Sequence, residues 1–160
     1  MRSLIHGWVV GVGLGLCAES CAVVDRDPLG RIIYGVAGTV ELDEFLRAHP
    51  LSQGQALQAD LVERTGAASY HVVQVATHET PHRHAAHDLA VTVLRGGGTL
   101  HLADRTVEMT MGDTAIVPRG VAHWFERVGG EVAVAFVTFA PPLDAPDMIP
   151  LGIDSAADHQ

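Results

Sequence analysis

The stretch GDTAIVPRGVAH, residues 112–123, combines turn residues and a short apolar run within one short segment. Gly112 and Asp113 are residue types that reverse the chain, and the run AIV that follows has the composition of a short strand. PRG then predicts a second turn, after which a new strand begins. The stretch therefore predicts two short strands joined by a tight turn, the second of which begins at His123.

The same pattern of short strands and turns continues on both sides of this stretch. GGG, ADR, MGD and GG turn signals separate apolar runs that recur between residues 55 and 142, namely ALQADLV, SYHVVQVAT, LAVTVL, GTLHLA, RTVEMT, TAIVP and EVAVAFVTFA. Aromatic residues make up only 5% of the chain, whereas it has 17 glycines and many Val, Ala, Thr and Leu residues. We therefore expect an all-β domain over residues 55–142, either an antiparallel sandwich or a small barrel.

The segments that flank the predicted barrel have different patterns. Residues 23–54 are interpreted as a linker followed by a short helix, because ELDEFLRAHP places Leu42, Phe45 and Leu46 at helical spacing and ends at a proline. Residues 143–160 form a tail that is rich in Pro and Asp and polar at its end. We expect this tail to lie over the barrel and then to fray.

Residues 1–22 have the pattern of an export signal. Arg2 is followed by the mostly apolar run LIHGWVVGVGLGLC and then by small residues. Cleavage after Ala22 would give a periplasmic or secreted protein, whereas lipid modification at Cys17 or Cys21 would attach the chain to a membrane. A buried N-terminal strand is the alternative, although its glycines would weaken a strand interior. Both cysteines of the chain lie in this segment, so the mature fold is predicted to have no internal disulfide.

The charge of the chain limits the partners that it could bind. A formal net charge of −9 and a pI near 5.4 argue against binding to phosphate backbones. We therefore predict no nucleic-acid partner.

A second stretch, HETPHRHAAHD, covers residues 78–88 and contains four of the ten histidines of the chain. His82 and His84 are two positions apart, so in an extended strand both imidazoles point to the same face, roughly 7 Å apart. They could converge on one metal ion, or each could satisfy its ring nitrogens with hydrogen bonds in a barrel interior. The HxH pattern by itself does not separate these interpretations.

Together, the two stretches resemble the two sequence motifs of the cupin superfamily. The second motif is the more specific, because Gly112, Pro118, Gly120 and His123 have the spacing G-x5-P-x-G-x2-H. The resemblance covers residues 78–127 and implies a double-stranded β-helix, or jelly roll, with one divalent metal near the barrel centre. This implied fold agrees with the strand spacing described above.

The resemblance implies three metal ligands, His82 and His84 from the first motif and His123 from the second. The metal would be a divalent transition ion, with Fe, Mn, Zn, Ni and Cu all compatible with imidazole ligands. Trp124 and Phe125 follow the ligand in alternating orientation, so one of them should line the cavity beside the metal. Bulk beside the site would restrict it to small ligands.

The fourth ligand of the family is an acid, usually Glu, and here the pattern departs from the family. Asp88 has the shorter of the permitted spacings after the HxH, but Leu89 occupies the position seven residues before Gly96. We predict Asp88 as the fourth ligand, although its side chain is one methylene shorter than Glu. A site with His87 in this role, or with three histidines and water, is the alternative.

The resemblance leaves three functional hypotheses. The first is an extracytoplasmic metal-dependent enzyme, a dioxygenase or an isomerase, acting on a small oxygenated molecule. The second is a non-catalytic cupin that binds a small molecule or a metal, and the third is an interaction module with a vestigial site. We also predict a homodimer, because EVAVAFVTFA is a hydrophobic strand that would need covering if it lay at a sheet edge.

Overall fold

The computed structural model describes residues 31–34 and 38–152. The predicted leader, residues 1–22, and the DRDPLG part of the linker lie outside the described residues. Within those described ranges, no helix is long and apolar enough to cross a lipid bilayer.

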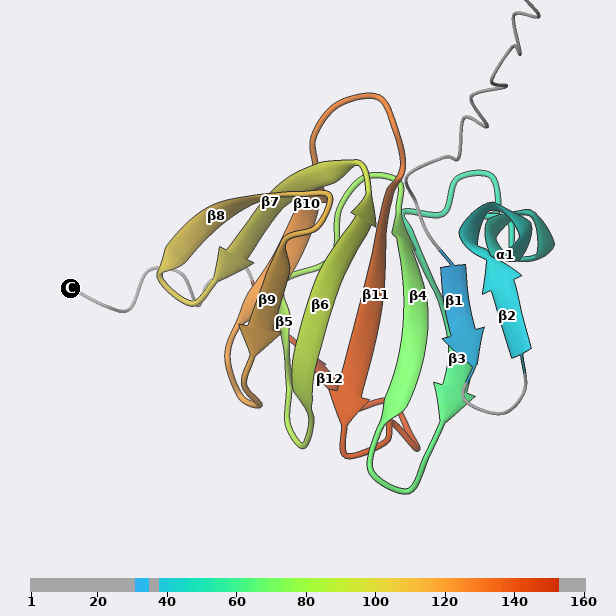
Figure 1. Ribbon diagram of the computed structural model, residues 1–160. Coiled ribbons are helices and arrows are strands. Elements are labelled where there is room, and N and C mark those ends of the chain that lie inside the picture. Colours follow the sequence, from blue (N-terminus) through green and yellow to red (C-terminus); the bar gives the residue numbers. More distant parts are fainter. Residues whose placement is uncertain (1–30, 35–37, 153–160) are drawn as a thin grey trace, which may run out of the picture.

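Two five-stranded antiparallel sheets form the body of the molecule (Figure 1). The first sheet has the strand order β3 (Leu57–Arg64), β4 (Ser69–Val75), β11 (Ala133–Ala140), β6 (Asp88–Arg95) and β9 (Thr114–Val117). The second has the order β12 (Met148–Pro150), β5 (His82–His84), β10 (His123–Arg127), β7 (Gly97–Leu102) and β8 (Arg105–Thr110). This arrangement confirms the predicted all-β jelly roll.

The hydrophobic core lies between the two sheets. Strand β7 illustrates how the sequence builds it, because Leu100 and Leu102 are buried while the intervening His101 is partly exposed. The opposing sheet contributes Val73, Leu89 and Val137 to the same cluster. Burying each such side chain stabilises the fold by roughly 1.5–3 kcal/mol, so the alternation fixes which face of each strand points inward.

A second, smaller cluster covers the other face of the first sheet. The hairpin β1 (Arg31–Tyr34) and β2 (Gly38–Glu41) precedes the helix α1 (Leu42–Ala48), and Figure 1 shows these elements beside β3 and β4. Leu42 and Phe45 of the helix pack with Val72 and Val134 of the sheet. The short helix confirms the prediction for this segment, whereas the hairpin before it was not predicted.

Strand β11 is not an edge strand. It forms long antiparallel ladders with β4 on one side and with β6 on the other. The expectation that EVAVAFVTFA needs covering at a sheet edge is therefore wrong, because two neighbours already satisfy its backbone. The homodimer stays a prediction without this support.

Gly98 allows β7 and β10 to approach closely. A Cβ atom at this position would overlap the backbone oxygen of Glu126 and the ring of Phe125. Since β10 carries His123, this close approach also helps to position the candidate site.

Candidate metal centre

Three buried histidines from β5 and β10 converge inside the barrel. His82 and His84 point to the same face of β5, and His123 is the direct cross-strand partner of His82. One nitrogen from each ring lies within 4.8 Å of the other two. Nitrogens bound to a common ion at about 2.1 Å lie roughly 3–3.5 Å apart, so a small contraction would complete the group.

Hydrogen bonds fix which nitrogen of each ring faces the centre. The Nδ1 atom of His82 lies 2.8 Å from Thr80 O, and that of His123 lies 3.0 Å from Val121 O. The Nδ1 atom of His84 lies 2.6 Å from Asp147 Oδ1. All three partners are acceptors, so each Nδ1 donates its proton and each Nε2 keeps a free lone pair. The donor set therefore fits a divalent transition metal.

Burial keeps two of these imidazoles, those of His84 and His123, neutral near pH 7. It lowers the pKa of His123 to about 4, outweighing the hydrogen bond to Val121 O, while the neighbouring His82 and His84 lower it further. The pKa of His84 is also lowered by burial, which outweighs the opposing effect of Asp147. Neutral imidazole is the form that binds metal, so no proton has to leave these two rings before an ion binds at neutral pH.

Asp147, from the C-terminal segment, forms hydrogen bonds that orient one of the three converging histidines. Its carboxylate accepts hydrogen bonds from His84 Nδ1, from His87 Nδ1 and, at 3.0 Å, from Ala86 N. Although burial alone would raise the pKa of Asp147, the hydrogen bonds from His87, His84 and Ala86 hold that pKa well below its usual range. The carboxylate is thus an ionised acceptor that orients the His84 ring.

The backbone around Asp147 is held to the ligand strand. Strand β12 pairs with β5 in a register that sets Met148 opposite His84 and Pro150 opposite His82. The sequence predicted that this segment lies over the barrel, but it did not predict that the segment contributes to the site. A single Asp in a Pro-rich tail carries no spacing signal toward a histidine 63 residues away. The rest of the tail, residues 153–160, lies outside the described residues.

The structure does not bring Asp88 to the histidine group. Leu89 next to it is buried in the core, and because side chains alternate along a strand, Asp88 points outward. Its carboxylate instead pairs with Arg119, 2.7 Å from Nη2 and 2.9 Å from the backbone N. These hydrogen bonds lower the pKa of Asp88 to about 2. The expectation that Asp88 is the fourth ligand is therefore corrected.

His87, the alternative fourth ligand, is buried but turned to other partners. Its Nδ1 bonds to Asp147, and its Nε2 lies 3.3 Å from Pro142 O. Both ring nitrogens are thus occupied, and His87 is not a member of the converging group. His87 contributes indirectly, because it bonds to the Asp147 carboxylate that orients His84.

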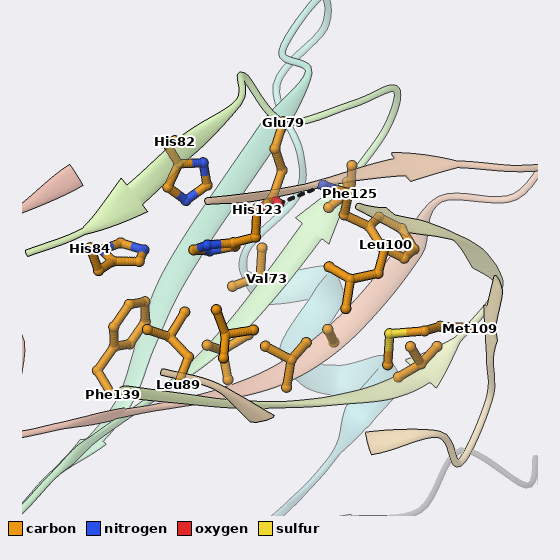
Figure 2. Close-up of a pocket in the computed structure, with 16 residues that line it drawn as sticks. Val73, Glu79, His82, His84, Leu89, Leu100, Met109, His123, Phe125 and Phe139 are labelled. Atoms are coloured by element: carbon orange, nitrogen blue, oxygen red, sulfur yellow. Dashed lines mark hydrogen bonds between the residues drawn. The ribbon is translucent and has the colours of Figure 1, made fainter. Parts of the chain in front are cut away.

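Glu79 is an acid that the sequence analysis did not single out, and its carboxylate reaches the cavity beside the histidines (Figure 2). Its Oε2 accepts a hydrogen bond from Phe125 N at 2.9 Å, while its own backbone N donates to Phe125 O at 2.9 Å. Burial raises the pKa of Glu79, although His82 and the Phe125 N–H oppose this shift. Glu79 lies three residues before the HxH, whereas the acid of the family motif follows the HxH. The motif therefore did not identify Glu79 as a site residue.

His82 and His84 lie where an inner cavity meets an outer groove, and His123 lines the inner cavity. The cavity has a volume of about 90 Å³, and the groove, of about 560 Å³, extends toward the C-terminal segment. Five residues line both: Val73, Glu79, His82, His84 and Phe139. A ligand in the groove would therefore reach the histidines from one side, with the apolar interior behind them.

The two aromatic residues after His123 separate as predicted. Phe125 lines the cavity, whereas Trp124 stacks on His101, with ring centroids 4.2 Å apart. Since the sheet has two faces, one of these side chains narrows the site and the other covers the outside of the barrel.

Comparison with known proteins agrees with this geometry. Residues 69–139 match the sequence profile of the family described as the cupin domain. An uncharacterized protein of Aquifex aeolicus is 35% identical over 120 residues, which cover 74% of this chain and 96% of that protein.

Solved structures share the fold at lower identity. An uncharacterized conserved protein with a double-stranded β-helix domain from Klebsiella pneumoniae has a TM-score of 0.59 and 22% identity, over 71% of this chain and 96% of that chain. KdgF from Halomonas sp. has a TM-score of 0.52 and 20% identity, over 57% and 85% of the two chains. With its two motifs, its jelly roll and this family match, the chain belongs to the cupin superfamily as a small protein with a cupin-2 domain.

Proposed function

We propose that this cupin binds one divalent transition metal through His82, His84 and His123 and acts on a small oxygenated molecule at that metal. The observation that carries the proposal is the set of three Nδ1 hydrogen bonds, which turn three Nε2 lone pairs toward one point. A vestigial site would have no reason to keep each ring in the tautomer that metal binding requires. This argues against the pure interaction module.

The three histidine ligands determine which chemistry a bound metal ion could support. A bound divalent ion with three neutral ligands keeps its positive charge, so it would polarise an oxygen of the small molecule that it binds. The protein contributes position and exclusion of water, because the lining behind the histidines is almost entirely aliphatic and aromatic. The polar end of the small molecule would lie at the histidines and a short apolar part would enter the cavity.

Dioxygenase and isomerase activities both remain compatible with this arrangement, since each begins with an oxygenated molecule bound to the metal. A non-catalytic binding role would use the same contacts. Turnover of candidate substrates by the metal-loaded protein separates the enzyme from the binding protein.

Metal analysis tests the shared first step. The purified chain is stripped with a chelator, offered each of Fe, Mn, Zn, Ni and Cu, and freed of unbound ion before its metal content is measured. We expect at least one of these ions to be retained near one per chain and to raise the thermal midpoint, because the unfolded chain lacks the assembled site. Retention of none of them would refute the proposal.

Export from the cytoplasm also remains part of the proposal, supported by the N-terminal sequence. Mass spectrometry of the natively produced protein should find that roughly the first twenty residues are absent. Labelling with palmitate would distinguish a lipid-anchored chain from a free one, and an intact N-terminus would contradict export by either route.

A further inference from the structure

Glu79 is the exception in the lining of the inner cavity. Of the sixteen described residues that line the cavity, twelve are apolar and three are the converging histidines, which leaves one carboxylate. Figure 2 shows its side chain descending beside His123, toward the same space that the histidines face. A carboxylate in such surroundings is costly for the fold unless its oxygens have partners.

Among the described residues, one carboxylate oxygen of Glu79 has a hydrogen-bond partner and the other does not. Oε2 accepts the Phe125 N–H, and the backbone hydrogen bond from Glu79 N to Phe125 O fixes the residue at a second point. Among the described residues, Oε1 has no hydrogen-bond donor. The free oxygen therefore belongs to a side chain whose position is already determined, and this residue lines both the cavity and the groove.

We infer that Oε1 of Glu79 accepts a hydrogen bond from the small molecule that binds at the three histidines, so that the site selects molecules with a hydroxyl donor next to their metal-binding oxygen. The inference rests on the proposed function and adds a substrate class to it. The positive charge of a bound divalent ion favours the ionised, accepting form of the carboxylate. An acceptor held in place before binding discriminates well against molecules that lack the donor, because it would then be left unpaired.

The substitution Glu79→Gln reverses the polarity of this one position. The Phe125 N–H needs an oxygen as its acceptor, so the amide oxygen of the variant takes the place of Oε2. The amide NH2 group then faces the cavity where Oε1 was. The variant keeps the shape and the backbone contact of the native residue, but it offers a donor in place of an acceptor.

The experiment compares glycolate with acetate on the cobalt-loaded protein. Both probes bring a carboxylate to the metal, but only glycolate has a hydroxyl group beside it. Dissociation constants are measured from the visible absorption of bound Co²⁺, and the acetate constant is divided by the glycolate constant for each protein. This ratio removes the general effect of deleting a negative charge, since both probes are anions.

We expect Glu79→Gln to lower this selectivity for glycolate about tenfold, the effect of one hydrogen bond to a charged group. The matched control is Glu126→Gln, because Glu126 accepts a hydrogen bond from Trp124 Nε1 on the outer face of the sheet. The control should keep the wild-type ratio within about twofold. Cobalt content and thermal midpoint are measured for all three proteins, and both variants should retain cobalt.

The outcomes separate this inference from the proposed function. If the wild-type chain retains neither cobalt nor any of the five ions tested above, the proposed metal site fails, and the Glu79 inference fails with it. If it retains one of the five but not cobalt, the two dissociation constants are measured by calorimetry on the protein loaded with that ion. If cobalt binds and both probes change its spectrum, but Glu79→Gln leaves the ratio unchanged, the metal site stands and the inference is overturned. A variant that loses cobalt together with its selectivity would also overturn it, because Glu79 would then act on the metal itself.

Discussion

The two faces of the sheet β12-β5-β10-β7-β8 both carry histidines, but they hold them in different ways. On the inner face, His82, His84 and His123 are buried, and each has an Nδ1 hydrogen bond of 2.6–3.0 Å. On the outer face, His101 stacks on Trp124; its Nδ1 lies 3.5 Å from Thr106 Oγ1 and its Nε2 lies 3.7 Å from Glu126. Both faces thus carry histidine, but on the inner face the hydrogen bonds fix the tautomer of each ring and the three rings converge on one point.

The largest expected difference between the faces is in metal binding. His123→Ala removes one of three ligands and should reduce retained metal from about one ion per chain to a small fraction of that value. His101→Ala, on the outer face, should leave metal content unchanged. Elemental analysis of both variants after the same loading and desalting provides the measurement. Equal metal content in the two variants would remove the distinction between the faces.

The next difference concerns the stability of the metal-free protein against acid. The pKa of His123 is about 4 in the fold and 6.5 in its ordinary state, so between these values the unfolded chain binds a proton that the native chain does not. The free energy of unfolding should therefore be highest above pH 6.5 and fall by about 3 kcal/mol as the pH drops to 4.

Urea unfolding of chelator-treated protein at several pH values measures this effect. His123→Gln should reduce the pH dependence over this range by the contribution of His123, and the part that comes from His84, whose pKa is also lowered by burial, should remain. His101→Gln serves as the control and should retain the wild-type slope. A wild-type slope in His123→Gln would mean that other groups cause the acid sensitivity.

Asp147 should produce a smaller effect that is also confined to the inner face. Asp147→Ala removes the acceptor that orients His84 and frees the His87 ring, so metal affinity should fall about 10–100-fold while binding remains detectable. Competition with a chelator of known affinity measures this change. Glu126→Gln, which alters the acid near the outer His101, should not change the affinity.

Asp88 should produce the smallest effect of the series. Its carboxylate pairs with Arg119 at the surface, so Asp88→Asn should change metal affinity by no more than about twofold. The same chelator competition applies. A loss as large as that of Asp147→Ala would restore Asp88 as a ligand and would require a different arrangement of the start of β6.

The repetition of short patterns explains why so much of the fold could be predicted. Alternating apolar residues and turn signals predicted the strands, and the spacing of two in HRH placed His82 and His84 on one face. The G-x5-P-x-G-x2-H spacing identified His123. These features depend on residues close together in the chain, and tertiary contacts did not change them.

The positions of the acidic residues around the histidines could not be predicted from the spacing of residues in the sequence. Asp88 had a suitable spacing, but burial of Leu89 turned it outward, and Arg119, 31 residues away, became its partner. Asp147 reaches His84 only because β12 pairs with β5. Glu79 faces the cavity because its segment runs beside β10 and bonds to Phe125 at two points.

The sequence by itself therefore determined the jelly roll, the inward face of β5 and the three histidines at its centre. The tertiary structure decided which acids surround them, which strand lies in the middle of the first sheet and which segment closes the site. The physical reason is the range of each interaction. Strand parity is set by burying one face of a local segment, whereas a carboxylate takes whichever donors the packing of distant segments brings within hydrogen-bond distance.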